Sequence, residues 1–167
     1  MNIIKKIFLT ALFILVPFNL NALDPKSTGK YKNWESFVLN TEKGKICFAQ
    51  TVPVKRVPAS VKRDDSRIFV TFRPVDNVRD EVSVTSGHTY KTSSVTGKSG
   101  KSSYSFFSQN NFAWLLDERE EQGFIKLMKR ATNLMIIART SKGAQTTDHY
   151  SMMGFTKAYN TAKKTCS

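Results

Sequence analysis

Histidine is the side chain that most often serves as a general base near neutral pH, and this sequence contains two, His88 and His149. His149 directly follows Asp148, and serine is abundant, so the residue types of a Ser-His-Asp hydrolase are present. Adjacent strand residues point to opposite faces, which prevents Asp148 from orienting the ring of His149. No G-x-S-x-G nucleophile motif occurs. We therefore predict no catalytic residue, with Asp148 and the histidines as surface polar residues.

Metal binding is not indicated either. The histidines are 61 positions apart, and the only cysteines, Cys47 and Cys166, are also far apart, so no compact Cys/His ligand cluster exists. Asp64 with Asp65, and the glutamates at 118, 120 and 121, could attract a cation, but those glutamates also suit the first turn of a helix. We expect no metal and no cofactor, and the sequence identifies no small-molecule substrate.

The first 22 residues have the layout of a secretory signal peptide. Lys5 and Lys6 form a basic start, a mostly apolar run follows from Ile7 to Phe18, and small or polar residues lead to Ala22. The apolar run is too short to cross a membrane as a helix. We predict cleavage near Ala22 and a periplasmic or secreted protein. Leu20 fits the A-x-A cleavage pattern poorly, so an uncleaved N-terminal anchor is the alternative.

The charge balance predicts anionic partners. The formal net charge of +13 becomes +11 once Lys5 and Lys6 are removed with the leader. Such a surface attracts nucleic acid, lipid headgroups or acidic glycans. Because export separates the protein from nucleic acid, we expect an anionic envelope component or another protein, and no nucleic acid.

Export also bears on the cysteines. The two thiols form an even pair in a chain that leaves the reducing cytosol, so a disulfide between Cys47 and Cys166 is the simplest interpretation. Two buried free thiols are the alternative.

Basic residues supply the candidate binding site. The candidate anion-binding residues are Arg67, Arg73, Arg79, Lys126, Lys129 and Arg130. If the fold brings them together, their side chains would bind phosphate or carboxylate groups; otherwise they only solvate the surface. Aromatic residues such as Trp34, Phe107 and Trp114 are predicted to belong to the core.

Short segments of alternating apolar and polar residues follow residue 32 and predict strands. They cover residues 33–40, 46–54, 66–74, 80–87, two short strands within 104–118, then 133–141 and 146–151. The continuous apolar run in 133–141 predicts a strand buried on both faces. Pro53 and Pro58 exclude a central strand. We expect a solvated turn at 62–66 and an exposed loop or hairpin tip at 91–103.

Two segments have helical periodicity instead. In residues 120–131 the apolar side chains recur at i, i+3, i+4 and i+7, with glutamates in front and basic residues behind. At the C-terminus an apolar stripe is formed by Phe155, Ala158, Tyr159 and Ala162. Ser151 is the expected cap of this helix. Cys166 follows Phe155 by about three turns and returns to the same stripe.

Together these elements predict one mainly β domain, an antiparallel β-sandwich or barrel-like fold with one internal helix and one C-terminal helix. Residues 1–22 are the signal peptide, residues 23–32 form a flexible lead-in, and the domain covers residues 33–167, with order beginning at Trp34.

The C-terminal elements follow a fixed sequence of motifs. An apolar strand leads to a Ser-x-Gly turn at Ser141 and Gly143, then to a polar strand and to a Ser-x-x-Gly-Phe helix start at residues 151–155. This arrangement resembles the invasion-associated locus B family of exported alphaproteobacterial proteins, and the EVSV run at 81–84, Trp34 and Cys47 also fit it. The resemblance covers roughly residues 30–166. It implies a periplasmic or surface-associated β-rich domain, linked by the family name to host-cell entry, and it carries little information about molecular activity.

The sequence therefore favours an exported, non-enzymatic binding protein that contacts an anionic envelope component or another protein. The alternative is an enzyme that acts on cell-envelope polymers.

Overall fold

The computed structural model describes residues 24–167, so the predicted signal peptide lies outside the described residues. These residues form one antiparallel sheet of 11 strands in the order β1-β2-β3-β5-β6-β9-β8-β7-β10-β11-β4. The sheet is not closed, because β1 and β4 are its two edges. The predicted class, mainly β and antiparallel with one internal and one C-terminal helix, is confirmed.

The elements have the following bounds: β1 (Lys26–Tyr31), β2 (Trp34–Thr41), β3 (Gly44–Thr51), β4 (Lys55–Val57), β5 (Arg67–Arg73), the short 3-10 helix η1 (Pro74–Asp76), β6 (Val78–Thr85), β7 (Val95–Ser99), β8 (Ser102–Gln109), β9 (Phe112–Trp114), α1 (Glu118–Arg130), β10 (Asn133–Arg139), β11 (Gln145–Ser151) and α2 (Phe155–Thr165).

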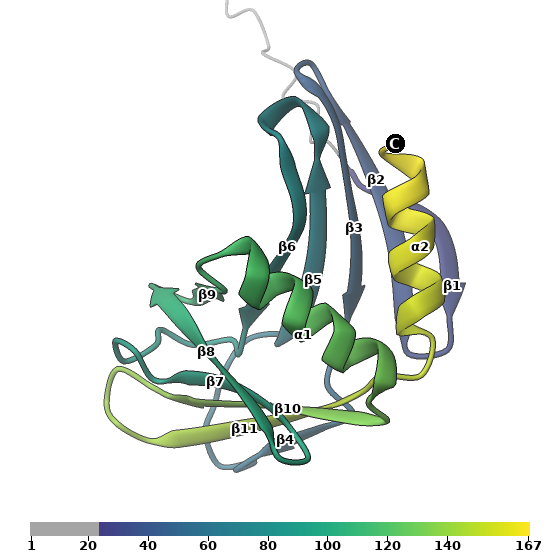
Figure 1. Cartoon of the computed structure of the whole chain (residues 1–167). Coiled ribbons are helices and arrows are strands. Elements are labelled where there is room, and N and C mark those ends of the chain that lie inside the picture. Colours follow the sequence, from purple (N-terminus) through teal and green to yellow (C-terminus); the bar gives the residue numbers. More distant parts are fainter. Residues whose placement is uncertain (1–23) are drawn as a thin grey trace, which may run out of the picture.

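The sheet is strongly bent (Figure 1). Strands β2, β3, β5 and β6 stand side by side in one half, and β4, β7, β10 and β11 cross below them in the other half. Strand β8 joins the halves, since it pairs with β9 on one side and with β7 on the other. Both helices lie on the inner side of this bend, where the core forms.

The core follows the period-two pattern of the strands. In β5 the side chains of Ile68, Val70 and Phe72 are buried, as the alternation predicts, and the intervening residues are half-exposed. β10 alternates in the same way instead of being buried on both faces, which corrects the prediction. The reason is that neither helix covers the outer face of this strand, so Met135 and Ile137 stay half-exposed.

Regular structure begins at Lys26, eight residues before the predicted start at Trp34. The polar residues of β1 give no apolar pattern, but β1 is an edge strand and pairs with β2 along most of its length. The segment 91–103 contains the predicted hairpin tip, at residues 100–101 between β7 and β8. The rest of it is not an exposed loop, because Val95 is buried and β7 is a central strand between β8 and β10. Strand β4 follows Pro53 and lies at a sheet edge, as the prolines predict.

Helix α1 begins two residues before its predicted start. The side chain of Asp117 accepts a hydrogen bond from the backbone N–H of Glu120 at 2.8 Å and caps the helix. Acidic residues occupy the first turn and Lys129 and Arg130 the last, which suits the helix dipole. Phe124 and Met128 point into the core.

Helix α2 buries the predicted stripe that contains Phe155 and Tyr159. Its N-cap is Gly154, with φ +97°, and Ser151 belongs to β11 instead, which corrects the predicted cap. Glycine is required at 154 because a Cβ there would collide with the backbone oxygen of Tyr31.

The predicted disulfide is present. Cys166, at the end of α2, is bonded to Cys47 of β3, with the Cα atoms 5.8 Å apart and 119 positions between them. A bond of this kind indicates an oxidising, extracytoplasmic environment. Neither α1 nor α2 is long and apolar enough to cross a membrane.

Candidate functional site

The outer face of the first half of the sheet carries aromatic side chains instead of the polar ones expected on a solvated face. The members of this aromatic face are Phe37, Phe48, Phe69, Phe107, Phe112 and Trp114. Its orientation follows from the disulfide. Cys47 points inward to α2, so its neighbour Phe48 points outward.

Strand register places these rings on the same face. Phe37 is the cross-strand partner of Phe48, and Trp114 is the partner of Phe107. Ser83 bridges the two groups, because it is the partner of both Phe69 and Trp114. Residues directly opposite each other share one face of a sheet, so the six side chains lie on the same face, over β2, β3, β5, β9 and β8, with Ser83 of β6 between the two groups.

Several of these rings contact one another. Phe37 and Phe48 stack with centroids 5.2 Å apart, and Phe48 meets Phe69 edge-on at 6.1 Å. Phe112 and Trp114 are stacked at 6.0 Å. Phe107 is 49% exposed and the other five are half-exposed. Contiguous exposed aromatic area of this kind marks an interaction surface.

Two arginines stand beside the aromatic face on β5. Arg73 makes a bidentate pair with Glu81, at 3.0 and 2.8 Å, and a further contact of 3.4 Å with Asp76. The hydrogen bonds that Arg73 donates to Glu81 raise the pKa of Arg73 above its ordinary value. Arg67 pairs with Asp65 at 3.0 Å. Both guanidinium groups are therefore held by carboxylates of the protein.

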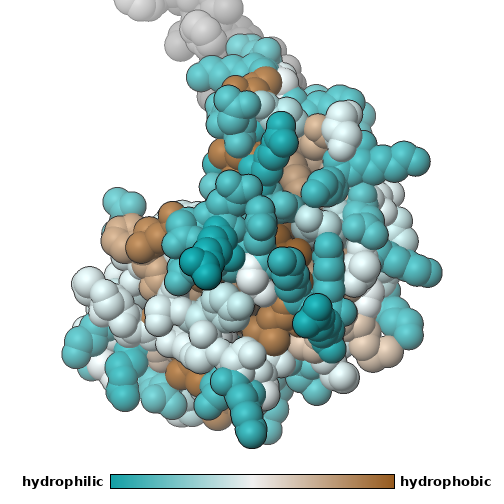
Figure 2. All heavy atoms as spheres, in the orientation of Figure 1, coloured by the Kyte–Doolittle hydropathy of each residue, from teal (hydrophilic) through white to brown (hydrophobic). Residues whose placement is uncertain are grey.

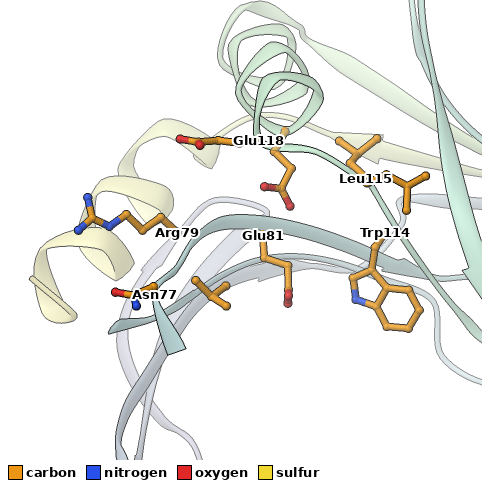
Figure 3. Close-up of a pocket in the computed structure, with 9 residues that line it drawn as sticks. Asn77, Arg79, Glu81, Trp114, Leu115 and Glu118 are labelled. Atoms are coloured by element: carbon orange, nitrogen blue, oxygen red, sulfur yellow. The ribbon is translucent and has the colours of Figure 1, made fainter. Parts of the chain in front are cut away.

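A cleft of about 620 Å³ opens where the aromatic face meets α1 (Figure 3). Glu81 and Trp114 lie on its sheet side, and Glu118 lies on its helix side. Glu121 adds a third carboxylate to the lining, and Arg79 is the one cation among the lining residues. In Figure 2 apolar side chains gather at this place, over the junction of β9 and α1, where Leu116 is 72% exposed.

Glu121 has the most altered carboxyl group of the cleft. Burial raises its pKa to about 7, and the nearby charges of Glu81, Asp80 and Glu118 act in the same direction. The backbone N–H of Val82, which donates to Glu121 at 3.3 Å, opposes this shift only in part. Glu121 is therefore partly protonated at neutral pH.

Two of the residues considered for hydrolysis, Asp148 and His88, are engaged in contacts within the fold. Asp148 is fully buried and forms an ion pair with Arg63, which corrects the predicted surface position of Asp148. In the predicted solvated turn at 62–66 three residues are exposed, whereas the side chains of Arg63 and Ser66 are buried. His149 points to the opposite face of β11, as predicted. His88 bonds to the hydroxyl of Thr146 at 2.9 Å, and burial lowers its pKa. Among residues 24–167 no group of three or more histidine, cysteine or acidic side chains is placed to hold a metal ion.

The predicted anion-binding residues lie at several separate places. Arg67 and Arg73 pair with acids beside the aromatic face, and Arg79 lines the acidic cleft. Lys126 lines another hollow with Asp117 and Glu120. Lys129 covers the ring of Tyr159, with its Nζ 4.0 Å from the ring centroid, and Arg130 is exposed at the end of α1.

Sequence reasoning missed the aromatic face because it assigned such side chains to the core. Trp34 is indeed fully buried, but Phe107 and Trp114 are not, which corrects that prediction. A signal was present, since segments such as Phe37–Leu39 and Ile46–Phe48 are apolar on both faces of their strands. Comparison of the chain with protein-family models, curated proteins and solved structures finds no match.

Proposed function

We propose that this chain is an exported, non-enzymatic binding protein that holds a polysaccharide of the cell envelope against the aromatic face. The observation that supports this most directly is the set of six exposed or half-exposed rings that five strands place on one face of the sheet. A location in the periplasm or outside the cell, after removal of residues 1–22, belongs to the same proposal. It agrees with the disulfide and with membership of the invasion-associated locus B family, which we propose from the sequence resemblance.

The chemistry of the aromatic face suits a carbohydrate. Pyranose rings present flat faces of C–H groups, which pack on aromatic rings without a charged partner. The charges beside the rings are already balanced, because Arg73 is held by Glu81 and Arg67 by Asp65. These pairs leave polar atoms at the border of the face that can bond to sugar hydroxyl groups.

The net charge has a different part in this proposal. A formal charge of +13 for the whole chain, or +11 without the leader, attracts an anionic polymer over distances of about 10 Å at moderate salt. Contact between sugar rings and the aromatic face would then distinguish a polysaccharide from other anionic polymers. We expect salt to weaken capture without abolishing it.

Co-sedimentation with purified peptidoglycan sacculi tests this proposal. Phe107→Ser removes an exposed ring, and about 1 kcal/mol, or roughly a fivefold weaker affinity, is expected from the loss of a half-exposed apolar side chain. Met153→Ser is the matched control, because Met153 is 48% exposed but lies between β11 and α2. Equal retention of both variants, or no sedimentation of the unchanged protein at low salt, would contradict the proposal.

A second candidate function, hydrolysis of an envelope polysaccharide, is favoured by one observation. Glu121, whose pKa is raised to about 7, lies in a cleft with a second carboxyl group, that of Glu81, which forms an ion pair with Arg73. One protonated and one ionised carboxyl group are the requirement for glycoside hydrolysis. This activity would be established if the unchanged protein and Glu120→Gln release soluble fragments from sacculi and Glu121→Gln does not. No release would exclude it for this substrate.

A further inference from the structure

A buried carboxylate lies on β11, beside the edge strand β4, and shares no residue with the cleft of Figure 3. Asp148 of β11 is fully buried, and Arg63 binds it with both terminal nitrogens, at 2.9 and 2.7 Å. The side chain of Arg63 is 2% exposed, and it also donates to the backbone oxygen of Ser86 at 3.3 Å. This pair is balanced in charge.

A second guanidinium group approaches the same carboxylate. Arg56 of β4 is the cross-strand partner of Asp148, and its Nε lies 3.9 Å from the Oδ1 of Asp148. One terminal nitrogen of Arg56 donates to the backbone oxygen of Asp64. Two guanidinium groups therefore share one carboxylate, which leaves one positive charge without a counter-charge at a partly buried position.

The Nε–H group of Arg56 is also without a hydrogen-bond partner among the described residues. It is buried, although the side chain as a whole is 33% exposed. A buried donor on a charged group without an acceptor is costly. An anion from outside the chain can approach the charge of Arg56 through the exposed part of its side chain.

The other charges around this position do not restore the balance. Lys55 and Lys62 add positive charge from β4 and from the loop that follows it. Asp65 is exposed and is engaged by Arg67, and the carboxylate of Asp64 belongs to an exposed residue with no ion pair within the described range. The charges of Arg63 and Arg56 both lower the pKa of His88, while Asp148 raises it.

A hollow lies beside these cations. Its volume is about 310 Å³, and we call it the β4 pocket; it is lined by Arg56, Pro58, Ala59, Val61, Lys62 and Arg63. We infer that the β4 pocket binds a small oxyanion, a phosphate or carboxylate group, with Arg56 and Lys62 as the residues that contact it and Arg63 as the residue that Asp148 holds in place. Guanidinium groups match the geometry of such oxyanions, and a lysine supplies a further charge.

This site is independent of the aromatic face and of the proposed polysaccharide. It also differs from the six basic residues that the sequence suggested, because none of them lines the β4 pocket. The same chemistry could come from a free phosphate or from the headgroup of an anionic lipid, so the experiment has one arm for each source.

The first arm uses inorganic phosphate. We expect phosphate to raise the melting temperature of the unchanged protein above that in chloride at equal ionic strength, because it binds the folded state alone. Isothermal titration with phosphate should show about tenfold weaker binding for Arg56→Gln and a smaller loss for Lys62→Gln, as for a lost hydrogen bond to a charged group. Lys142→Gln removes an exposed lysine from the β10–β11 turn and is the matched control.

The second arm uses vesicles of phosphatidylglycerol and phosphatidylcholine, with pure phosphatidylcholine as the blank. Vesicle binding that Arg56→Gln loses and Lys142→Gln keeps assigns the pocket to a lipid headgroup. Phosphate binding with the same pattern, without vesicle binding, assigns it to a free anion. Equal loss in Arg56→Gln and Lys142→Gln, or no phosphate-specific effect in either arm, overturns the inference. Circular dichroism of each variant confirms that it is folded, so a null result is informative.

Discussion

Removal of the disulfide gives the most quantitative test of this structure. The bond joins Cys47, fully buried in β3, to Cys166 at the end of α2. It closes a loop between residues 119 positions apart. In the chain-entropy model a loop of that size stabilises the folded state by about 5 kcal/mol at 25 °C, and measured values range from about 0 to 5 kcal/mol.

We expect the double variant Cys47→Ala/Cys166→Ala to lose about 2 to 5 kcal/mol of unfolding free energy, a large fraction of the total for a domain of this size. Urea unfolding followed by tryptophan fluorescence measures this loss. Trp34 is a suitable probe, because its ring is buried 4.8 Å from that of Phe155 in α2. The slope of the transition should also rise, since the unfolded chain without the bond exposes more surface.

Amide hydrogen exchange then shows which elements lose stability when the disulfide is removed. Amides of α2 should exchange faster in the double variant than those of the central strand β5, because the bond attaches the last turn of α2 to β3. A loss below about 1 kcal/mol together with unchanged exchange in α2 would refute the reasoning. Two thiols that react with an alkylating reagent in freshly isolated, folded protein would refute the extracytoplasmic assignment as well.

Three further outcomes follow from other parts of the fold. Because folding raises the pKa of Glu121 to about 7, its contribution to the free energy of unfolding is complete at pH values below the pKa of the unfolded chain and is lost as pH rises through about 7. The variant Glu121→Gln should therefore lose less stability than the unchanged protein between pH 5 and pH 8, by about 1 kcal/mol for a half-exposed group, as measured by urea titration. Asp148→Asn leaves Arg63 buried without its counter-charge and should cost about 3 to 5 kcal/mol in the same assay, and a loss under 1 kcal/mol would disprove the buried pair. Gly154→Ala should cost at least about 1 kcal/mol, because φ is +97° and the added Cβ meets Tyr31; an unchanged melting temperature would contradict this geometry.

The strands and helices were largely predictable because they depend on local periodicity. The alternation of Ile68, Val70 and Phe72 identified β5 and its buried face, and the 3.6-residue stripe identified α2. Local pattern failed at β1, whose polar residues are ordered by pairing with β2 instead of by burial. It also misplaced the cap of α2, because the glycine that replaces a serine cap is selected by its close approach to Tyr31 in a distant strand.

The candidate sites were much less predictable. A Phe on a strand has the same local sequence signature whether it faces the core or solvent, and only the position of α1 and α2 on one side of the bend leaves Phe48 and Phe107 outside. The residues that line the β4 pocket all lie within positions 56–63, but the position of Arg63 depends on Asp148 of β11, which is also the cross-strand partner of Arg56 and is 92 positions from it in sequence. No local pattern connects Arg56 and Arg63 with Asp148.

The sequence by itself determined the β-rich class, the two helices, the excess of positive charge and the pairing of two cysteines, because periodicity, composition and an even thiol count are properties of the chain alone. Tertiary structure decided which face of each strand is covered, where the charges of Asp148, Arg63 and Glu121 are buried, and which cations lie together. These depend on strand order and on the bend of the sheet, since the free energy of a charged or aromatic side chain is set by its neighbours in space.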